Sequence, residues 1–319
     1  VLSPLEKYFS GIFGGRMSHF HRIGLISAGL ACALAVSWPV TAAEDGAGDK
    51  QESKKRDARA EWWWDEGWWA AGKLEEPKNY AVETRRLSYK NGDVEVPVFI
   101  ARPKGHDRFP GILFVHGRRG LDDWNQLHAM RLAARGFVVF APDLFTGRFV
   151  EQFPIEHDYQ LEEDLSRAVG VLLAQPDIKG RKFCTVGISR GGYYTLKLAV
   201  TQKHQGKAMA CYVGYYPAMQ DPNAPEPAQV YQYAPEVNEL NIPALIFVGE
   251  QEQYHRKRGI EASVDTLKSK GIKAILVEYP GVGRGFDFRG ENVRTFADNL
   301  AAKDAVARTA KFIREHLGQ

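Results

Sequence analysis

The segment around Ser189 constrains the fold more than any other part of the sequence. Residues 182–188 (KFCTVGI) are an apolar run typical of a buried strand, and residues 190–198 (RGGYYTLKL) are compatible with a helix. The turn between them reads G-I-S-R-G-G, so it contains the motif G-x-S-x-G. Such a strand, turn and helix predict a nucleophile elbow, which lifts a serine Oγ above the end of a parallel sheet. An ordinary strand-to-helix turn is less favoured, because the motif's required neighbours are present on both sides.

From about Tyr80 onward, short apolar strands alternate with helices. An antiparallel hairpin is expected first, with strands at 84–89 and 94–101 around Asn91-Gly92. Further strands are expected at 111–116, 136–144, 208–216, 244–250 and 274–279, and helices at 122–134, 158–174, 260–270 and 303–317. These strands lack polar alternation, which predicts an α/β fold with a mostly parallel sheet covered by helices on both faces. Active sites in such sheets lie beyond the carboxyl ends of the strands.

Composition and residue spacing exclude several classes of function. The 319 residues carry a formal net charge of +3, and no run of basic residues forms a nucleic-acid-binding stripe. The nine histidines are scattered without metal-ligand spacing, and no glycine-rich phosphate loop is present. We therefore expect no metal, no cofactor and no nucleic-acid partner.

The N-terminal 43 residues resemble an export signal. Met17 begins a mildly basic start, an apolar run and a small-residue end, so residues 17–43 are predicted to be a signal peptide cleaved near Ala42 or Ala43. Residues 1–16 are then interpreted as an upstream extension. The apolar run is too short for a convincing membrane span, so none is expected after cleavage. The mature protein is predicted to be periplasmic or secreted.

Residues 44–78 are predicted to be a linker and a tryptophan-rich arm, followed by the main domain at 79–319. Five of the seven tryptophans fall within Trp62–Trp69. They could form an aromatic surface for a sugar, an aromatic substrate or a membrane interface. The favoured interpretation is an arm that packs across the domain and covers apolar surface.

Two cysteines lie in predicted core strands of this domain, Cys184 and Cys211. Export would permit a disulfide between them. The favoured expectation is nevertheless two buried free thiols, which behave as small hydrophobic side chains.

Motifs from about Ser88 to Leu317 resemble the dienelactone hydrolase family of α/β-hydrolases. The matching segments are ARP (101–103), FPGILFVH (109–116), AARGFVVFAPDL (133–144), GISRGG (187–192), IPALIFVG (242–249), YPGVG (279–283), FD (286–287) and FIREHL (312–317). The resemblance implies an α/β-hydrolase fold. It also implies hydrolysis of a small carboxylic ester or lactone by a nucleophile, an acid and a histidine.

Carrying the family's catalytic positions over gives Ser189 as nucleophile and Glu252 as acid, with Arg284 in the position of the histidine. The arginine is a serious departure from the family pattern. A serine hydroxyl needs a base to take its proton, and a guanidinium has no acceptor lone pair. We expect Arg284 and Glu252 to form an ion pair instead.

Several explanations of this departure remain open. His255 or His116 could supply the base near Ser189. Arg284 could instead bind an anionic group, together with Arg118, Arg119 or Arg190, which makes an anionic substrate a hypothesis. A third explanation is a degenerate hydrolase that binds without turnover, and a sequence variant at position 284 is a fourth.

The oxyanion hole of the predicted hydrolase is expected to be intact. Its donors would be the backbone N–H groups of Arg190, directly after the nucleophile, and of Arg118. Gly117 stands where the family usually has a glutamate. The sequence therefore predicts an exported serine hydrolase that forms an acyl-enzyme on Ser189, with a non-catalytic binding protein on the same fold as the alternative.

Overall fold

The computed structural model describes residues 60–62, 80–290 and 292–318, all within one unit, Ser53–Gln319. The predicted extension at 1–16, the signal peptide at 17–43 and nearly all of the 44–78 linker and arm lie outside the described residues. None of the described helices combines the length and the apolar character that a bilayer crossing requires.

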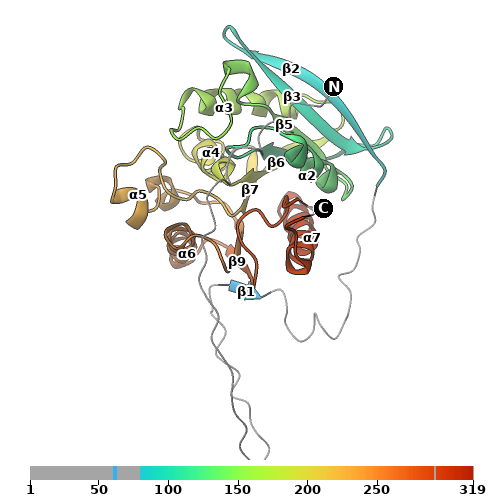
Figure 1. The fold of residues 1–319 in the computed structure, drawn as a ribbon. Coiled ribbons are helices and arrows are strands. Elements are labelled where there is room, and N and C mark those ends of the chain that lie inside the picture. The colour runs from blue at the N-terminus through green and yellow to red at the C-terminus, as the bar shows by residue number, and fades with distance from the viewer. Residues whose placement is uncertain (1–59, 63–79, 291, 319) are drawn as a thin grey trace, which may run out of the picture. The chain divides into compact units, whose positions relative to one another are not determined.

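A nine-stranded sheet runs through the described part of the chain in the order β1-β9-β8-β7-β6-β4-β5-β3-β2 (Figure 1). Going along the sheet in that order, each neighbouring pair of strands from β1 through to β5 is parallel. Strand β3 pairs antiparallel with both β5 and β2, so the edge of the sheet is the hairpin that the sequence predicted. The bounds are β1 (Ala60–Trp62), β2 (Val82–Asn91), β3 (Val94–Pro103), β4 (Phe109–Val115), β5 (Val138–Pro142), β6 (Ile178–Ile188), β7 (Met209–Tyr215), β8 (Ala244–Gly249) and β9 (Ala274–Tyr279). The predicted fold is confirmed, and β1 is an additional strand that the sequence did not reveal.

Helices cover both faces of the sheet (Figure 1). On one face α2 (Asp123–Ala133) and α7 (Phe296–Leu317) share an apolar core with the strands. The other face is covered by α3 (Gln160–Leu173), α4 (Arg190–Ala199) and α6 (Tyr254–Ser269). Three short helices, η1 (Thr146–Arg148), α5 (Ala228–Tyr231) and η2 (Pro235–Asn238), lie in the connections. Apolar side chains thus fill both faces, which explains why the strands read as continuous apolar runs.

Two helices begin earlier than predicted. Helix α6 starts at Tyr254 rather than at 260, because its first turn is polar and does not belong to the buried stripe. Helix α7 starts at Phe296 rather than at 303, behind a capping box formed by Thr295 and Asp298. Both early turns border cavities.

Cys184 and Cys211 form a disulfide, so the prediction of two free thiols is wrong. The two residues are direct partners in the parallel pairing of β6 with β7, and both are fully buried. Their side chains therefore leave the same face of the sheet at neighbouring positions. The sequence identified two core strands but did not state that they are adjacent and in this register.

Removing this disulfide is expected to lower the free energy of unfolding by about 3 kcal/mol. The bridged cysteines are 27 residues apart in sequence, and closing a loop of that length restricts the unfolded chain by roughly that amount. Urea titration of the wild type with and without dithiothreitol measures the effect. The double variant Cys184→Ala/Cys211→Ala should not respond to the reductant. An unchanged wild-type midpoint after complete reduction would contradict the prediction.

Candidate active site

Ser189 occupies a strained turn between β6 and α4. Its backbone has φ 54° and ψ −115°, a positive φ that serine rarely adopts. Hydrogen bonds hold the turn: the Ser189 N–H donates to the Tyr215 carbonyl at 3.0 Å, and the Ser189 carbonyl accepts from the N–H of Ala218 at 2.7 Å. The serine is partly exposed at the carboxyl end of the sheet. This is the backbone arrangement of a nucleophile elbow.

The glycines around the serine are required by close backbone approach. A β-carbon on Gly191 would overlap the carbonyl oxygen of Val115 in β4, and one on Gly192 would overlap Pro217. The helix that follows the serine can therefore begin directly against the neighbouring strand. Close packing of this kind explains why the motif has glycine at these positions.

Arg284 connects the serine to Glu252. Its Nη1 lies 2.7 Å from Glu252 Oε2, and its Nη2 donates to Ser189 Oγ at 2.7 Å. Glu252 follows β8 and Arg284 follows β9, and a hydrogen bond from the Gln251 N–H to the Val282 carbonyl at 3.0 Å ties these two loops together. The Glu252 side chain is fully buried, whereas that of Arg284 is 25% exposed. The predicted ion pair is confirmed.

The contact between Arg284 and Ser189 determines what the serine can do. A guanidinium only donates hydrogen bonds, so Ser189 Oγ is the acceptor and keeps its own proton. A cation at 2.7 Å from Oγ favours the serine alkoxide over the neutral hydroxyl. Arg284 can therefore stabilise negative charge on this oxygen but cannot remove the proton that creates it.

His116 serves the fold rather than the serine. It is fully buried, its Nε2 accepts from the Leu144 N–H at 3.1 Å, and its Nδ1 donates to the Gly117 carbonyl at 2.8 Å. Burial lowers the pKa of His116, which keeps the ring neutral in this environment. With both nitrogens engaged, this ring is unsuited to act as the base.

His255 belongs to a neighbouring cavity. It lies in the first turn of α6 and lines a space of about 240 Å³, whereas Ser189 opens into a different cavity. Within the described residues, the hydrogen bonds of the Ser189 hydroxyl include none from either candidate histidine. The structure thus does not bring His116 or His255 to the serine.

A cavity of about 280 Å³ adjoins Ser189 and is rich in arginine. Four arginines line it, Arg118, Arg119, Arg256 and Arg284, alongside the apolar side chains of Phe153, Ile188 and Phe288. The neighbouring 240 Å³ cavity shares Arg118 and Arg256 and adds Arg190. Besides Arg284, the predicted binding arginines Arg118, Arg119 and Arg190 therefore all border these two cavities. Arg256 is a further arginine here, which the sequence analysis did not single out.

Most of these arginines contact uncharged acceptors. Arg190 donates to the carbonyls of Ile155 and Glu156 at 3.0 and 3.1 Å, and Arg118 donates to the Phe153 carbonyl. Arg256 donates to the side-chain oxygen of Gln253 at 2.7 Å. Arg119, in contrast, pairs with Asp122 at 2.6 Å.

Positive charge therefore accumulates at the mouth of the site. Burial, followed by repulsion from Arg284, lowers the pKa of Arg256 to about 10, against a raising effect of Glu252. Burial also lowers the pKa of Arg190. Arg256 remains protonated at neutral pH, and an anion in this cavity would offset the repulsion that Arg284 exerts on it.

The two residues predicted to supply oxyanion donors, Arg190 and Arg118, lie on segments that adjoin Ser189. Arg190 is the first residue of α4, so its N–H has no partner within the helix. The preceding loop approaches the elbow so closely that a β-carbon on Gly117 would lie 3.0 Å from Ser189 Cβ and 2.8 Å from the Ile188 carbonyl oxygen. Glycine at 117, where the family usually has glutamate, permits this approach and places the Arg118 segment beside the serine.

A buried network beneath the site was missed by the sequence analysis. The Tyr216 hydroxyl donates to Asp287 Oδ1 at 2.6 Å, and His128 Nδ1 lies 2.9 Å from Asp287 Oδ2. The Arg284 guanidinium stacks over the Tyr216 ring with its carbon 5.1 Å from the centroid. Asp287 entered the sequence analysis only as part of the Phe-Asp family motif, and nothing in the sequence indicated its partners. Among the described residues, no group of His, Cys, Asp or Glu is arranged to hold a metal ion.

Comparison with known proteins agrees with this geometry. Residues 96–317 match the profile of the dienelactone hydrolase family. The crystal structure of a dienelactone hydrolase homologue from Klebsiella pneumoniae superposes with a TM-score of 0.59 at 20% identity, covering 74% of this chain and 99% of the other. An esterase from Pyrobaculum calidifontis gives a TM-score of 0.57 at 19% identity, covering 73% of this chain and 85% of the other. These two likenesses show the shared fold.

Two sequence relatives differ in how much of their length the chain spans. A protein described as a carboxymethylenebutenolidase from Salmonella typhimurium is 23% identical over 241 residues, which cover 70% of this chain and 84% of the relative. Mouse acyl-coenzyme A thioesterase 6 is 29% identical over 123 residues, 39% of this chain, and the match spans only 28% of that relative's length. Family and neighbours together support a hydrolase of ester or lactone type. Since the family match extends over most of the chain, the protein belongs to the dienelactone hydrolase family.

Proposed function

We propose that the protein cleaves an anionic carboxylic ester or lactone through an acyl-enzyme on Ser189. The observation that carries this proposal is the hydroxyl of Ser189, which stands at a nucleophile elbow and opens into a cavity lined by four arginines. The elbow supports acyl transfer, and the arginines support a negatively charged substrate. The volume of about 280 Å³ suits a small molecule.

The anionic group of the substrate would bind to Arg256 and Arg118. Both guanidiniums line the serine cavity and bond to uncharged acceptors, so a carboxylate could replace those partners with charge-assisted hydrogen bonds. Arg119 is less available because Asp122 already neutralises it. Binding of the substrate's charged end by these arginines would hold its ester group near Ser189.

Proton removal from Ser189 would depend on hydroxide from solvent. Arg284 cannot accept the proton, so hydroxide takes it and becomes water. The positive charge of the Arg284 guanidinium then stabilises the serine alkoxide. Oγ then attacks the acyl carbon, and the N–H groups of Arg190 and Arg118 stabilise the resulting oxyanion. The alkoxide leaving group departs with a proton from water. A second hydroxide cleaves the acyl-enzyme, and Ser189 recovers its proton from water as the product acid is released.

The disulfide supports our proposal that the protein works outside the cytoplasm. Disulfides persist in oxidising compartments such as the periplasm and are rare in reducing ones. The Cys184–Cys211 bridge is consistent with export to such a compartment. Fractionation of cells that express the full reading frame would test this location.

Replacing Arg256 with glutamine is expected to raise KM for a carboxylate-bearing phenyl ester about tenfold and to leave KM for a neutral phenyl ester nearly unchanged. The lost interaction is a charge-assisted hydrogen bond of about 1.5 kcal/mol, and only the acidic ester makes it. Steady-state kinetics on the two esters measure the difference. Arg258→Gln provides the matched control, because Arg258 is an exposed arginine on the same helix that lines neither cavity.

The variant Ser189→Ala tests whether hydrolysis of these two esters depends on Ser189, as the proposed mechanism requires. Loss of all ester hydrolysis above the solvent rate supports an acyl-enzyme on Ser189. The competing function is anion binding without turnover, which the Arg284–Ser189 contact favours because it leaves the serine without a base. Wild-type hydrolysis equal to that of Ser189→Ala, with tight binding of the acidic ester, would replace our proposal with that function.

A further inference from the structure

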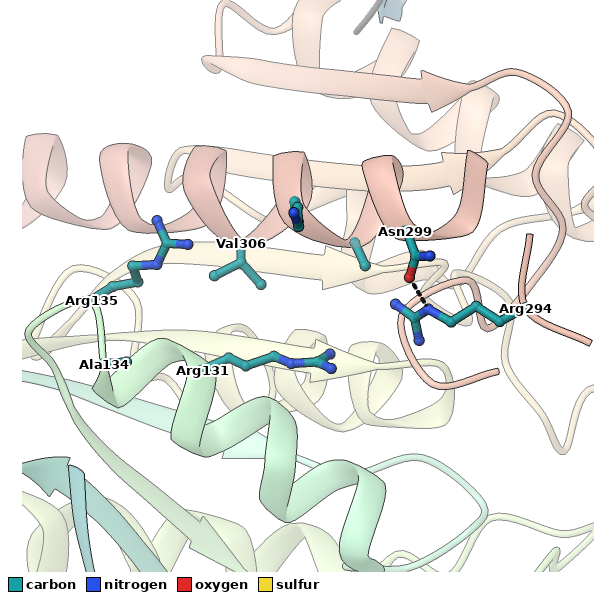
Figure 2. Close-up of a pocket in the computed structure, with 8 residues that line it drawn as sticks. Arg131, Ala134, Arg135, Arg294, Asn299 and Val306 are labelled. Atoms are coloured by element: carbon teal, nitrogen blue, oxygen red, sulfur yellow. Dashed lines mark hydrogen bonds between the residues drawn. The ribbon is translucent and has the colours of Figure 1, made fainter. Parts of the chain in front are cut away.

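A second arginine-rich cavity lies between α2 and α7, apart from the serine. It has a volume of about 410 Å³ and shares none of its lining residues with the serine cavity. Figure 2 shows Arg131 projecting from α2 and Arg294 from the segment before α7, on opposite sides of the space. Lys303 from α7 also lines it, and no aspartate or glutamate does.

Two guanidiniums of this cavity converge on one backbone oxygen. Arg131 Nη1 donates to the Asp287 carbonyl at 3.2 Å, and Arg294 Nη1 lies 3.5 Å from the same oxygen. Arg294 also contacts the Arg289 carbonyl at 3.4 Å and donates to the Asn299 side chain, as the dashed line in Figure 2 marks. A neutral carbonyl shared by two cations offsets little of their repulsion.

The Asp287 carboxylate does not line this cavity. Both oxygens of the Asp287 carboxylate are already engaged, one by Tyr216 and the other by His128. Burial lowers the pKa of Arg131, and repulsion from Arg294 lowers it further, although the Asp287 charge acts in the opposite direction. Because a guanidinium carries its charge throughout the physiological pH range, the cavity presents permanent positive charge.

We propose that this cavity binds a phosphate-type oxyanion at a site separate from the serine. A tetrahedral oxyanion has acceptors in several directions and can accept hydrogen bonds from Arg131, Arg294 and Lys303 together. The volume of about 410 Å³ exceeds what one phosphate needs, so a small organic phosphate also fits. Arg131 of α2, Arg294 of the segment before α7 and Lys303 of α7 supply the charge that such a ligand requires.

Binding is tested on Ser189→Ala, so that its outcome does not depend on the proposed hydrolysis. Inorganic phosphate and pyrophosphate are titrated by calorimetry and by thermal unfolding, with sodium chloride matched to the same ionic strength to remove general screening. We expect saturable binding of both, tighter for pyrophosphate. Arg294→Gln and Lys303→Gln should each weaken it about tenfold, the equivalent of about 1.4 kcal/mol. Lys303 is exposed, so its replacement keeps the test valid if Arg294→Gln destabilises the fold.

Arg256→Gln separates this site from the serine cavity. Unchanged phosphate affinity in Arg256→Gln, together with the losses in Arg294→Gln and Lys303→Gln, supports the site between α2 and α7. Affinity lost in Arg256→Gln but kept in Arg294→Gln would place the phosphate in the serine cavity and overturn the proposal. Absence of saturable binding at matched ionic strength would overturn it as well.

Discussion

Replacing Arg284 with histidine is expected to raise kcat/KM for a neutral activated phenyl ester by about a hundredfold or more. A general base typically contributes 10²–10⁴-fold to such reactions, roughly the range expected here. Arg284 Nη1 lies 2.7 Å from Glu252 Oε2, and its Nη2 lies 2.7 Å from Ser189 Oγ. A histidine ring at position 284 could therefore bond to the carboxylate through one nitrogen and to the hydroxyl through the other. The neutral imidazole would then take the proton that a guanidinium cannot accept.

The pH dependence distinguishes this base from a mere change of charge. In the mechanism proposed for the wild type, hydroxide removes the proton, so kcat/KM should rise about tenfold per pH unit through neutrality without a plateau. In Arg284→His, kcat/KM should level off above the pKa of the imidazole, about 6.5 in isolation and higher beside the Glu252 carboxylate. The value of kcat/KM rises with pH because only the neutral imidazole can accept the proton. This form is scarce below the pKa of the imidazole and predominates above it.

Two variants serve as controls for the histidine. Arg284→Gln removes the guanidinium without adding a base, so it should show no plateau and no gain. Ser189→Ala in the Arg284→His background should lose the whole gain. If Arg284→His is no faster than Arg284→Gln, or if the wild type already shows a plateau near neutral pH, the proposed account of the missing base is wrong.

The fold could be predicted because its signals are local. The strand and helix around Ser189 follow from local hydrophobic pattern, and the glycines at 191 and 192 belong to the motif between them, although the groups that require them, Val115 and Pro217, are distant in sequence. The ion pair of Glu252 with Arg284 was also predictable once family positions were assigned, because β8 and β9 are neighbours whose following loops meet at one edge of the sheet. Local pattern and the order of motifs were sufficient for these features.

Contacts that depend on register and on tertiary packing could not be predicted. The Cys184–Cys211 bridge requires β6 beside β7 in one specific alignment, which neither strand's sequence states. His116 was a candidate base, yet the Leu144 N–H, which follows β5, occupies its Nε2. Arg256 was missed because the polar first turn of α6 carries no periodic signal for a helix.

The network around Asp287 is the feature whose loss should most affect stability. Asp287 is 3% exposed, and it accepts from the Tyr216 hydroxyl at 2.6 Å and bonds to His128 Nδ1 at 2.9 Å. His128 is itself buried against the Tyr215 ring, with centroids 4.7 Å apart. Both partners are buried, so removing the carboxylate leaves each of them without this acceptor.

Asp287→Ala is therefore expected to lower the free energy of unfolding by about 3–5 kcal/mol, because it leaves two buried groups without their partner at a cost of about 1–3 kcal/mol each. Tyr216→Phe removes one hydrogen bond of the same network and should cost only about 1–2 kcal/mol. Asp107→Ala is the matched control, because Asp107 is exposed, and its change should stay within about 0.5 kcal/mol. Urea denaturation of the three variants and the wild type measures the series. A loss in Asp287→Ala no larger than in Asp107→Ala would show that the carboxylate does not hold the site together.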